Sequence, residues 1–280
     1  MNKKTLGAIL LILTGLLYFA LPVAKSLNPS SPSAAAATET SKNKATPVKV
    51  PTEQTLALPL GVPILMYHKI GDELNNDAVI SKERFNEHMA YLDQQGYHPI
   101  SLDELYGYVS QKKLLPSKPV VLTFDDGYRD TYEIAFPILK KYGFKSVLFI
   151  SAAGSGDRLS WQELQEMKAS GMEVSSHSYN HRDLDGLSAQ IQTEEINKSK
   201  EIFDQMLNQD TRYFCYPNGS YNQTTLNLLQ EKGIVLAVTT QPGWAKPGDN
   251  PLTLRRIWMG NSVDLQHLAE RLTREDYSII

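Results

Sequence analysis

The chain has 280 residues, 41 % of them hydrophobic, a formal net charge of −3 and one cysteine, Cys215. This length allows one domain with its own core plus a tail, and a lone cysteine excludes an intramolecular disulfide. Residues 1–60 contain six lysines against Glu39 and Glu53, which is +4 and leaves −7 for residues 61–280. Because phosphate binding needs a basic face, we expect no nucleic-acid partner.

The N-terminus predicts export. Lys3 and Lys4 precede an uncharged run of 20 residues, 5–24, and Lys25 closes it. That run is long enough to span a bilayer, and leading positive charge keeps the tail inside. We predict a signal peptide or membrane anchor over residues 1–25. The protein would then be extracytoplasmic, either secreted or tethered to the outer face of the membrane if the segment is uncleaved.

A linker and one folded domain follow. Residues 26–60 are rich in Ser, Pro, Ala, Thr and Lys, a composition that cannot bury a core, so we predict a disordered linker. Residues 61–280 form the predicted domain, which we expect to be monomeric.

Within this domain, short β-branched runs alternate with longer amphipathic runs. The predicted strands are 63–68, 97–101, 120–124, 146–150, 172–176, 213–217, 235–239 and 254–258, and the predicted helices are 81–95, 102–112, 130–142, 160–170, 188–208, 223–232 and 262–273. Alternation of this kind predicts a parallel sheet. Seven or eight units favour a closed or nearly closed (β/α) barrel, with a doubly wound open sheet as the alternative.

Three helix starts match a capping box, in which a polar residue is followed by Glu three positions later. The pairs are Ser101/Glu104, Asp130/Glu133 and Ser160/Glu163. We therefore expect helices to begin directly after these three polar residues.

Reactive side chains follow four of the predicted strands. They are His68, the doublet Asp125 and Asp126, the pair His177 and His181, and the segment Pro217-Asn218-Gly219. Loops converge at the carboxyl ends of parallel strands, so we expect these residues to meet at one end of the barrel.

Asp126, His177 and His181 would form a two-histidine, one-carboxylate metal site. Three protein ligands leave positions open for water and substrate, as in catalytic zinc centres, and the same set also suits iron. Asp125 would then be free to act as a base toward an activated water. Two simpler interpretations stay open here: an ordinary Asp-Asp-Gly turn, and two histidines on the surface of a helix.

The segments TFDDGY (123–128) and HSYNH (177–181) resemble the first two signature motifs of the polysaccharide deacetylases. This is carbohydrate esterase family 4, with its chitooligosaccharide deacetylase-like domain, and the resemblance covers residues 62–260. It implies a distorted (β/α) barrel of seven to eight strands. It also implies a divalent metal, usually zinc, on Asp126, His177 and His181, with cobalt, nickel or iron as alternatives. Asp125 is the implied general base in removing an acetyl group from a sugar amide.

Further motifs imply further roles. RYFCYPNGSYN (212–222) is similar to the family's third motif, so Pro217 and Asn218 would lie at the oxyanion, bound through the Asn218 main-chain N–H. GVPILMYHKI (61–70) looks like the poly-N-acetylglucosamine deacetylases, in which His68 matches the general-acid histidine. His267, in a Leu-x-His match to the last motif, is the alternative acid. Arg256 matches an arginine beside the catalytic aspartate.

Two further residues have expected roles that do not depend on the resemblance. Trp244 lies in the loop-like segment QPGWAKPGDN and either stacks on a sugar or covers the core. Cys215, with no base partner in the pattern, is expected to be a small buried hydrophobe.

The sequence thus predicts a metal-dependent enzyme that removes N-acetyl groups from an acetylated amino-sugar polysaccharide. An extracellular matrix polymer is favoured, and peptidoglycan or chitin oligomers are alternatives. Two other functions are weighed: an O-acetyl esterase acting on a polysaccharide such as xylan, and a non-catalytic carbohydrate-binding barrel.

Overall fold

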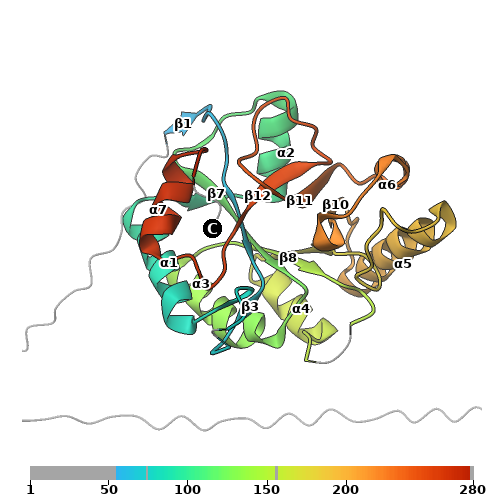
Figure 1. Ribbon diagram of the computed structural model, residues 1–280, viewed down its shortest axis with the longest axis horizontal. Helices are drawn as coiled ribbons and strands as arrows, with labels where there is room; N and C mark the ends of the chain where they lie inside the picture. Colours follow the sequence, from blue (N-terminus) through green and yellow to red (C-terminus); the bar gives the residue numbers. More distant parts are fainter. Residues whose placement is uncertain (1–54, 74, 155–156, 278–280) are drawn as a thin grey trace, which may run out of the picture. The chain divides into compact units, whose positions relative to one another are not determined.

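The computed structural model describes residues 55–73, 75–154 and 157–277, which belong to one compact unit (Figure 1). The predicted N-terminal segment 1–25 and the linker up to residue 54 lie outside the described residues. Among the residues that are described, no helix is long and apolar enough to cross a membrane.

Seven parallel strands form a closed barrel. They are β2 (Ile64–Tyr67), β7 (Pro119–Asp125), β8 (Val147–Ile150), β9 (Glu173–Ser176), β10 (Tyr213–Cys215), β11 (Leu236–Pro242) and β12 (Leu254–Trp258). Each pairs with the next in chain order, and β12 pairs back with β2, which closes the barrel. An eighth strand, β5 (His98–Pro99), pairs in parallel with the start of β7. The predicted barrel is confirmed, and the open-sheet alternative is wrong.

Helices lie around the outside of the strands (Figure 1). They are α1 (Lys82–Gln94), α2 (Leu102–Gln111), α3 (Phe136–Tyr142), α4 (Trp161–Ala169), α5 (Ala189–Leu207), α6 (Gln223–Glu231) and α7 (Leu265–Thr273). All seven correspond to predicted helices. Two strand pairs were not predicted, β1 (Leu56–Ala57) with β6 (Leu115–Pro116) and β3 (Lys69–Ile70) with β4 (Val79–Ile80). Two-residue strands are too short to show a periodic pattern.

One predicted capping box is wrong. The boxes at Ser101 and Ser160 form, but Asp130 already has helical backbone angles and makes no cap bond with its side chain. Its Oδ1 accepts instead from the N–H of Ile70, 3.1 Å away, at the end of β3. The helix opens with a π-helical turn, η1 (Thr131–Ala135), ahead of α3.

Side chains along the barrel strands point alternately to the two faces of the sheet and so contribute to two apolar layers. All seven residues of β7 are buried. Leu122 and Phe124 belong to the layer packed under α1, whereas Val121 belongs to a second cluster. Successive strand residues point to opposite faces, so Thr123 and Asp125 share the face of Val121. The strand that carries the acidic doublet is thus held by packing on both faces.

Candidate active site

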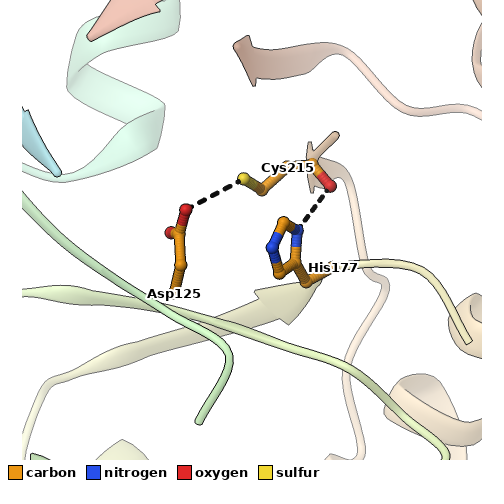
Figure 2. A group of neighbouring side chains, drawn as sticks. All are labelled: Asp125, His177 and Cys215. Carbon is orange, nitrogen blue, oxygen red and sulfur yellow. Dashed lines mark hydrogen bonds between the residues drawn. The ribbon is translucent and has the colours of Figure 1, made fainter. Parts of the chain in front are cut away.

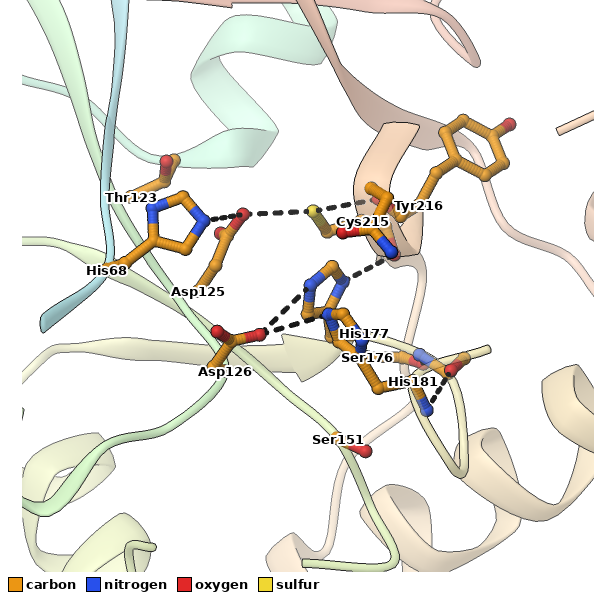
Figure 3. A network of polar contacts seen from close by, with 12 residues as sticks. His68, Thr123, Asp125, Asp126, Ser151, Ser176, His177, His181, Cys215 and Tyr216 are labelled. Carbon is orange, nitrogen blue, oxygen red and sulfur yellow. Dashed lines mark hydrogen bonds and ion pairs between the residues drawn. The ribbon is translucent and has the colours of Figure 1, made fainter. Parts of the chain in front are cut away.

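The acidic doublet sits where β7 ends, and the backbone there turns sharply. Asp125 is the last residue of the strand, and Asp126 and Gly127 have φ angles of 71° and 74°. The φ angle of Gly127 favours glycine, and a Cβ there would lie 2.8 Å from Cδ1 of Ile150, which would have to shift. This turn separates the two carboxylates: Asp125 stays with the barrel face of the strand, and Asp126 turns toward the histidines (Figure 3).

Asp126, His177 and His181 converge as predicted. The Oδ1 atom of Asp126 lies 3.1 Å from Nε2 of His181 and 3.6 Å from Nε2 of His177. The three ligand atoms all lie within 4.8 Å of one another. Tetrahedral zinc with ligands at 2.0–2.1 Å requires ligand atoms roughly 3.3 Å apart, so the arrangement fits a zinc-sized cation.

His177 is prepared as a neutral ligand. Its Nδ1 donates to the carbonyl oxygen of Cys215 over 2.8 Å, which leaves Nε2 with its lone pair facing Asp126. Burial lowers the pKa of His177 to about 4, so the imidazole is neutral near pH 7. A histidine must be neutral to bind a metal. The pKa of His181 is instead raised, chiefly by its hydrogen bond to Asp126.

The HSYNH segment is an irregular turn, not a helix, which rules out the surface-helix interpretation. Ser178 and His181 have positive φ angles of 64° and 56°, uncommon for residues other than glycine. Hydrogen bonds fix the turn: the N–H of His181 donates to Oγ of Ser178 over 3.0 Å, and Asn180 makes two bonds to Glu195 of α5. Strained backbone held in this way is typical of functional sites.

Asp125 is bound on its far side by Arg256. The guanidinium, fully buried, donates from Nη1 to Oδ1 over 2.8 Å and from Nη2 to Oδ2 over 2.6 Å. Arg256 is itself positioned by the carbonyl of Thr239 and the hydroxyl of Thr123. Burial alone would raise the pKa of Asp125, but the charge and hydrogen bonds of Arg256 outweigh burial and hold that pKa well below its usual range. Asp125 is therefore ionised at neutral pH.

A second potential ligand group, Asp125, His177 and Cys215, shares His177 with the first (Figure 2). Its carboxylate is already engaged, because both oxygens of Asp125 accept hydrogen bonds from Arg256. Burial raises the pKa of the Cys215 thiol well above its usual value, whereas metal binding needs the thiolate. The Asp126 group is thus the better cation site.

His68 reaches the same site from the end of β2. Its Nε2 lies 4.0 Å from Oδ2 of Asp125 (Figure 3). Its ring lies 4.9 Å from that of Trp258, whose Nε1 donates to Asp77 over 2.6 Å. Burial lowers the pKa of His68, against the opposing pull of Asp125 and Asp126.

Pro217 and Asn218 form a short 3-10 turn, η2 (Pro217–Gly219), after β10. Asn218 has a φ of 53°, and its side-chain amide donates to Asp183 over 2.7 Å. Because the side chain is engaged, a contribution of Asn218 to an oxyanion would come from its main chain.

Two predicted residues are not brought to this group. Nε1 of Trp244 donates to the carbonyl of Arg271 over 2.9 Å, and the ring packs against Gly61, ahead of β2. This placement fits the core-covering alternative. His267 lies in the first turn of α7, with Nδ1 2.9 Å from Oδ1 of its N-cap, Asp264.

Two contacts were missed from the sequence. The Sγ of Cys215 lies 3.1 Å from Nη2 of Arg256 and 3.5 Å from Oδ2 of Asp125, so Cys215 belongs to the polar cluster as well as to the core. Its place at the end of β10 was the available signal. Trp258 contacts His68 because β12 pairs with β2, so that the ends of the two strands are adjacent. The sequence did not show this pairing.

Comparison with known proteins gives consistent matches. The sequence model of the family Polysaccharide deacetylase matches residues 112–237. YxkH of Bacillus subtilis (strain 168), named as a polysaccharide deacetylase, is 37 % identical over 201 residues, which are 71 % of each chain. The poly-beta-1,6-N-acetyl-D-glucosamine N-deacetylase of Staphylococcus aureus (strain N315) is 26 % identical over 218 residues, covering 71 % of this chain and 73 % of that protein.

Solved structures agree. Streptococcus pyogenes deacetylase PplD in complex with acetate has a TM-score of 0.73 and 35 % identity, covering 77 % of this chain and 100 % of that one. IcaB from Ammonifex degensii has a TM-score of 0.67 and 28 % identity, covering 76 % and 96 %. This chain is therefore similar to these proteins over most of the described residues.

Proposed function

The chain belongs to the polysaccharide deacetylase family, a family of hydrolases, and from this premise we propose that it removes N-acetyl groups from an N-acetylglucosamine-containing polysaccharide. The observation that carries the proposal is the pairing of a cation-sized ligand set with an unligated, ionised carboxylate next to it. Peptidoglycan and chitin oligomers are alternative N-acetylated substrates. Poly-β-1,6-N-acetylglucosamine is favoured, because relatives that match this chain are named for that polymer.

Asp126, His177 and His181 would hold a divalent cation, with zinc favoured by the donor set. When bound, such a cation polarises the acetamide carbonyl and favours deprotonation of the attacking water. Asp125 would accept the proton of that water. Arg256 keeps Asp125 ionised and fixes the plane of its carboxylate, so that the base is oriented before substrate arrives.

His68 is the proposed acid. The nitrogen of an amide leaves only after it gains a proton, and His68 lies 4.0 Å from the base on the same side of the site. The lowered pKa of His68 makes its protonated form a stronger acid, and that form could give its proton to the departing sugar nitrogen. The products are acetate and a glucosamine unit. The alternative acid, His267, is disfavoured by its place beside Asp264 in the first turn of α7.

We further propose that the domain acts outside the cytoplasm as a monomer, carried there by the N-terminal apolar segment. The same segment would tether the protein to the membrane if it is not cleaved. If it is cleaved, the protein would be secreted, and the two forms are equal alternatives.

The proposal is tested by acetate release from poly-β-1,6-N-acetylglucosamine, chitin oligomers, peptidoglycan and acetylated xylan in parallel, with and without chelator. We expect release from at least one N-acetylated polymer, loss with chelator and recovery on adding zinc. Release from xylan alone would favour the O-acetyl esterase. Release from none of the four with metal supplied would favour the carbohydrate-binding barrel.

A further inference from the structure

A cavity extends away from the proposed cation site along the loop between β8 and α4. One part, of about 180 Å³, is lined by Asp126 and His181, and a second part, of about 310 Å³, reaches Trp161 at the start of α4. The two parts have four residues in common: Ser151, Ala153, Gly154 and Arg158. A substrate bound at the cation site would therefore have Arg158 beside it.

Arg158 is fixed in position by the loop that carries the acidic doublet. Its Nη1 donates to the carbonyl of Asp126 over 3.2 Å. Its guanidinium carbon lies 3.9 Å from the centre of the Tyr128 ring. The next residue, Leu159, donates its N–H to the carbonyl of Gly127 over 2.9 Å. Binding a ligand here would cost little side-chain entropy, because the side chain is already ordered.

The positive charge of Arg158 is not paired with a carboxylate in the described part of the chain. Two acids close in sequence, Asp157 and Glu163, are paired with another arginine, Arg129, which lies 2.8 Å from each of them. Among the described residues that line the larger part of the cavity, Arg158 is the only charged one. A guanidinium with free donors is suited to a carboxylate or phosphate, which it can bind through two parallel hydrogen bonds.

We propose that Arg158 forms an anion subsite next to the cation site, and that the preferred substrate is an amino-sugar polymer carrying a carboxylate or phosphate close to the acetamide. This inference rests on the proposed N-deacetylation, and it moves the substrate preference from the neutral poly-β-1,6-N-acetylglucosamine favoured above to an N-acetylated polymer that carries such an anion. Neutral N-acetylglucosamine polymers would still be cleaved, but with a lower kcat/KM than a polymer bearing such an anion.

The test compares three soluble oligosaccharides of equal length with the metal-loaded full chain. One is a neutral N-acetylglucosamine oligomer, one contains N-acetylmuramic acid and supplies a carboxylate, and one carries a phosphate monoester. The measured quantity is the ratio of kcat/KM on each anionic oligomer to that on the neutral one. We expect a ratio of about ten or more for at least one of them, and the arm that gives it identifies the anion.

Arg158→Gln should lower that ratio by about tenfold to hundredfold, mainly through KM, which is the usual contribution of hydrogen bonds to a charged group. Arg158→Lys should retain part of the preference. Arg212→Gln is the matched control. It removes the same charge from the residue directly before β10, at the end of the barrel away from the proposed site, and should leave the ratio unchanged. Metal content, measured on each variant, separates damage to the cation site from loss of the subsite.

Two results would overturn the inference: a wild-type ratio of one for both anionic oligomers, or an equal loss on neutral and anionic oligomers in Arg158→Gln. Equal loss would mean that Arg158 only positions Asp126. A wild-type enzyme that released no acetate from any N-acetylated oligomer would instead overturn the proposed function itself.

Discussion

The two carboxylates of the doublet differ because of their neighbours. Asp126 faces two imidazoles, and Asp125 faces a buried guanidinium. Each environment favours the charged form of the carboxylate. Only Asp126 lies beside imidazole nitrogens that could bind the same cation. Adjacent identical residues thus acquire different roles from a single turn of the backbone.

Replacing Arg256 should change the pH dependence of the reaction. Without its charge, burial raises the pKa of Asp125, and the base becomes protonated over a wider range of low pH. In Arg256→Gln we expect the acidic limb of kcat against pH to move upward and the rate at pH 7 to fall by about 10². Arg256→Lys keeps the charge and guards against a variant that fails to fold, and it should show a smaller displacement. An acidic limb that stayed in place in both variants would show that Arg256 does not set the protonation of the base.

Replacing His68 should separate amide from ester cleavage. An amide nitrogen needs a proton to leave and an ester oxygen does not, so His68→Ala should lower kcat on an N-acetylated oligomer by about 10² or more and spare an O-acetyl ester. The measurement is acetate release from matched amide and ester substrates. His98→Ala, a histidine in β5 that bonds to the carbonyl of Ser117, is the control. Equal losses on both substrates would argue against His68 as the acid.

At the scale of elements, the strand ends carry the chemistry. β2, β7, β9 and β10 deliver His68, the doublet, the histidine pair and the η2 turn to one end of the barrel. The start of β9, at the opposite end, has a structural role. Glu173 accepts the N–H of Leu102, the first residue of α2, at 3.1 Å and so ties that helix to the barrel.

Glu173 should make stability depend on pH. Burial raises its pKa from 4.5 to about 7, so the folded state retains a proton that the unfolded state loses as pH rises from 4.5 to 7. Stability therefore falls across that window and levels off above it. In Glu173→Gln, which keeps the acceptor and removes the charge, we expect a gain of up to about 3 kcal/mol at pH 8 and almost none at pH 4. Denaturant unfolding at the two pH values measures this.

The control for this prediction is Glu173→Ala, which leaves the N–H of Leu102 without its acceptor and should be destabilised at pH 4, where the native carboxyl is neutral. A Glu173→Gln variant with the same stability difference from wild type at both pH values would contradict the pKa argument.

The sequence predicted the elements better than the contacts between them. Hydrophobic periodicity located all seven helices, and the strand-end rule selected the three residues, Asp126, His177 and His181, that the structure brings together. Asp130 shows the limit: its spacing to Glu133 satisfies a capping box, yet the carboxylate is used by Ile70, a residue sixty positions earlier. Trp258 beside His68 and Cys215 beside Asp125 likewise depend on which strands become neighbours, which local pattern does not encode.

At the scale of the whole molecule, the barrel holds the site together from segments far apart in sequence. His68 and Arg256 lie 188 positions apart, yet both meet Asp125 because β12 pairs back with β2. A cation bound between β7 and the segment after β9 would add one more link between strands.

Such a cation should stabilise the fold. At a free zinc concentration of about 100 times Kd, binding to the native state alone adds about 2.7 kcal/mol to the free energy of unfolding. We expect the unfolding temperature of the chelator-treated chain to rise on adding zinc. The double variant His177→Ala/His181→Ala should show little rise. A rise of equal size in both proteins would place the ion elsewhere.

The most direct test of the account is acetate release by Asp125→Asn from a polymer that the wild type deacetylates, made on protein shown to contain one equivalent of metal. We predict that the variant retains the metal and that its rate falls by at least about 10², because the ligands are intact and the base is gone. Acetate release at the wild-type rate, or a variant that can no longer hold the metal, would contradict the assignment of Asp126 as ligand and Asp125 as base.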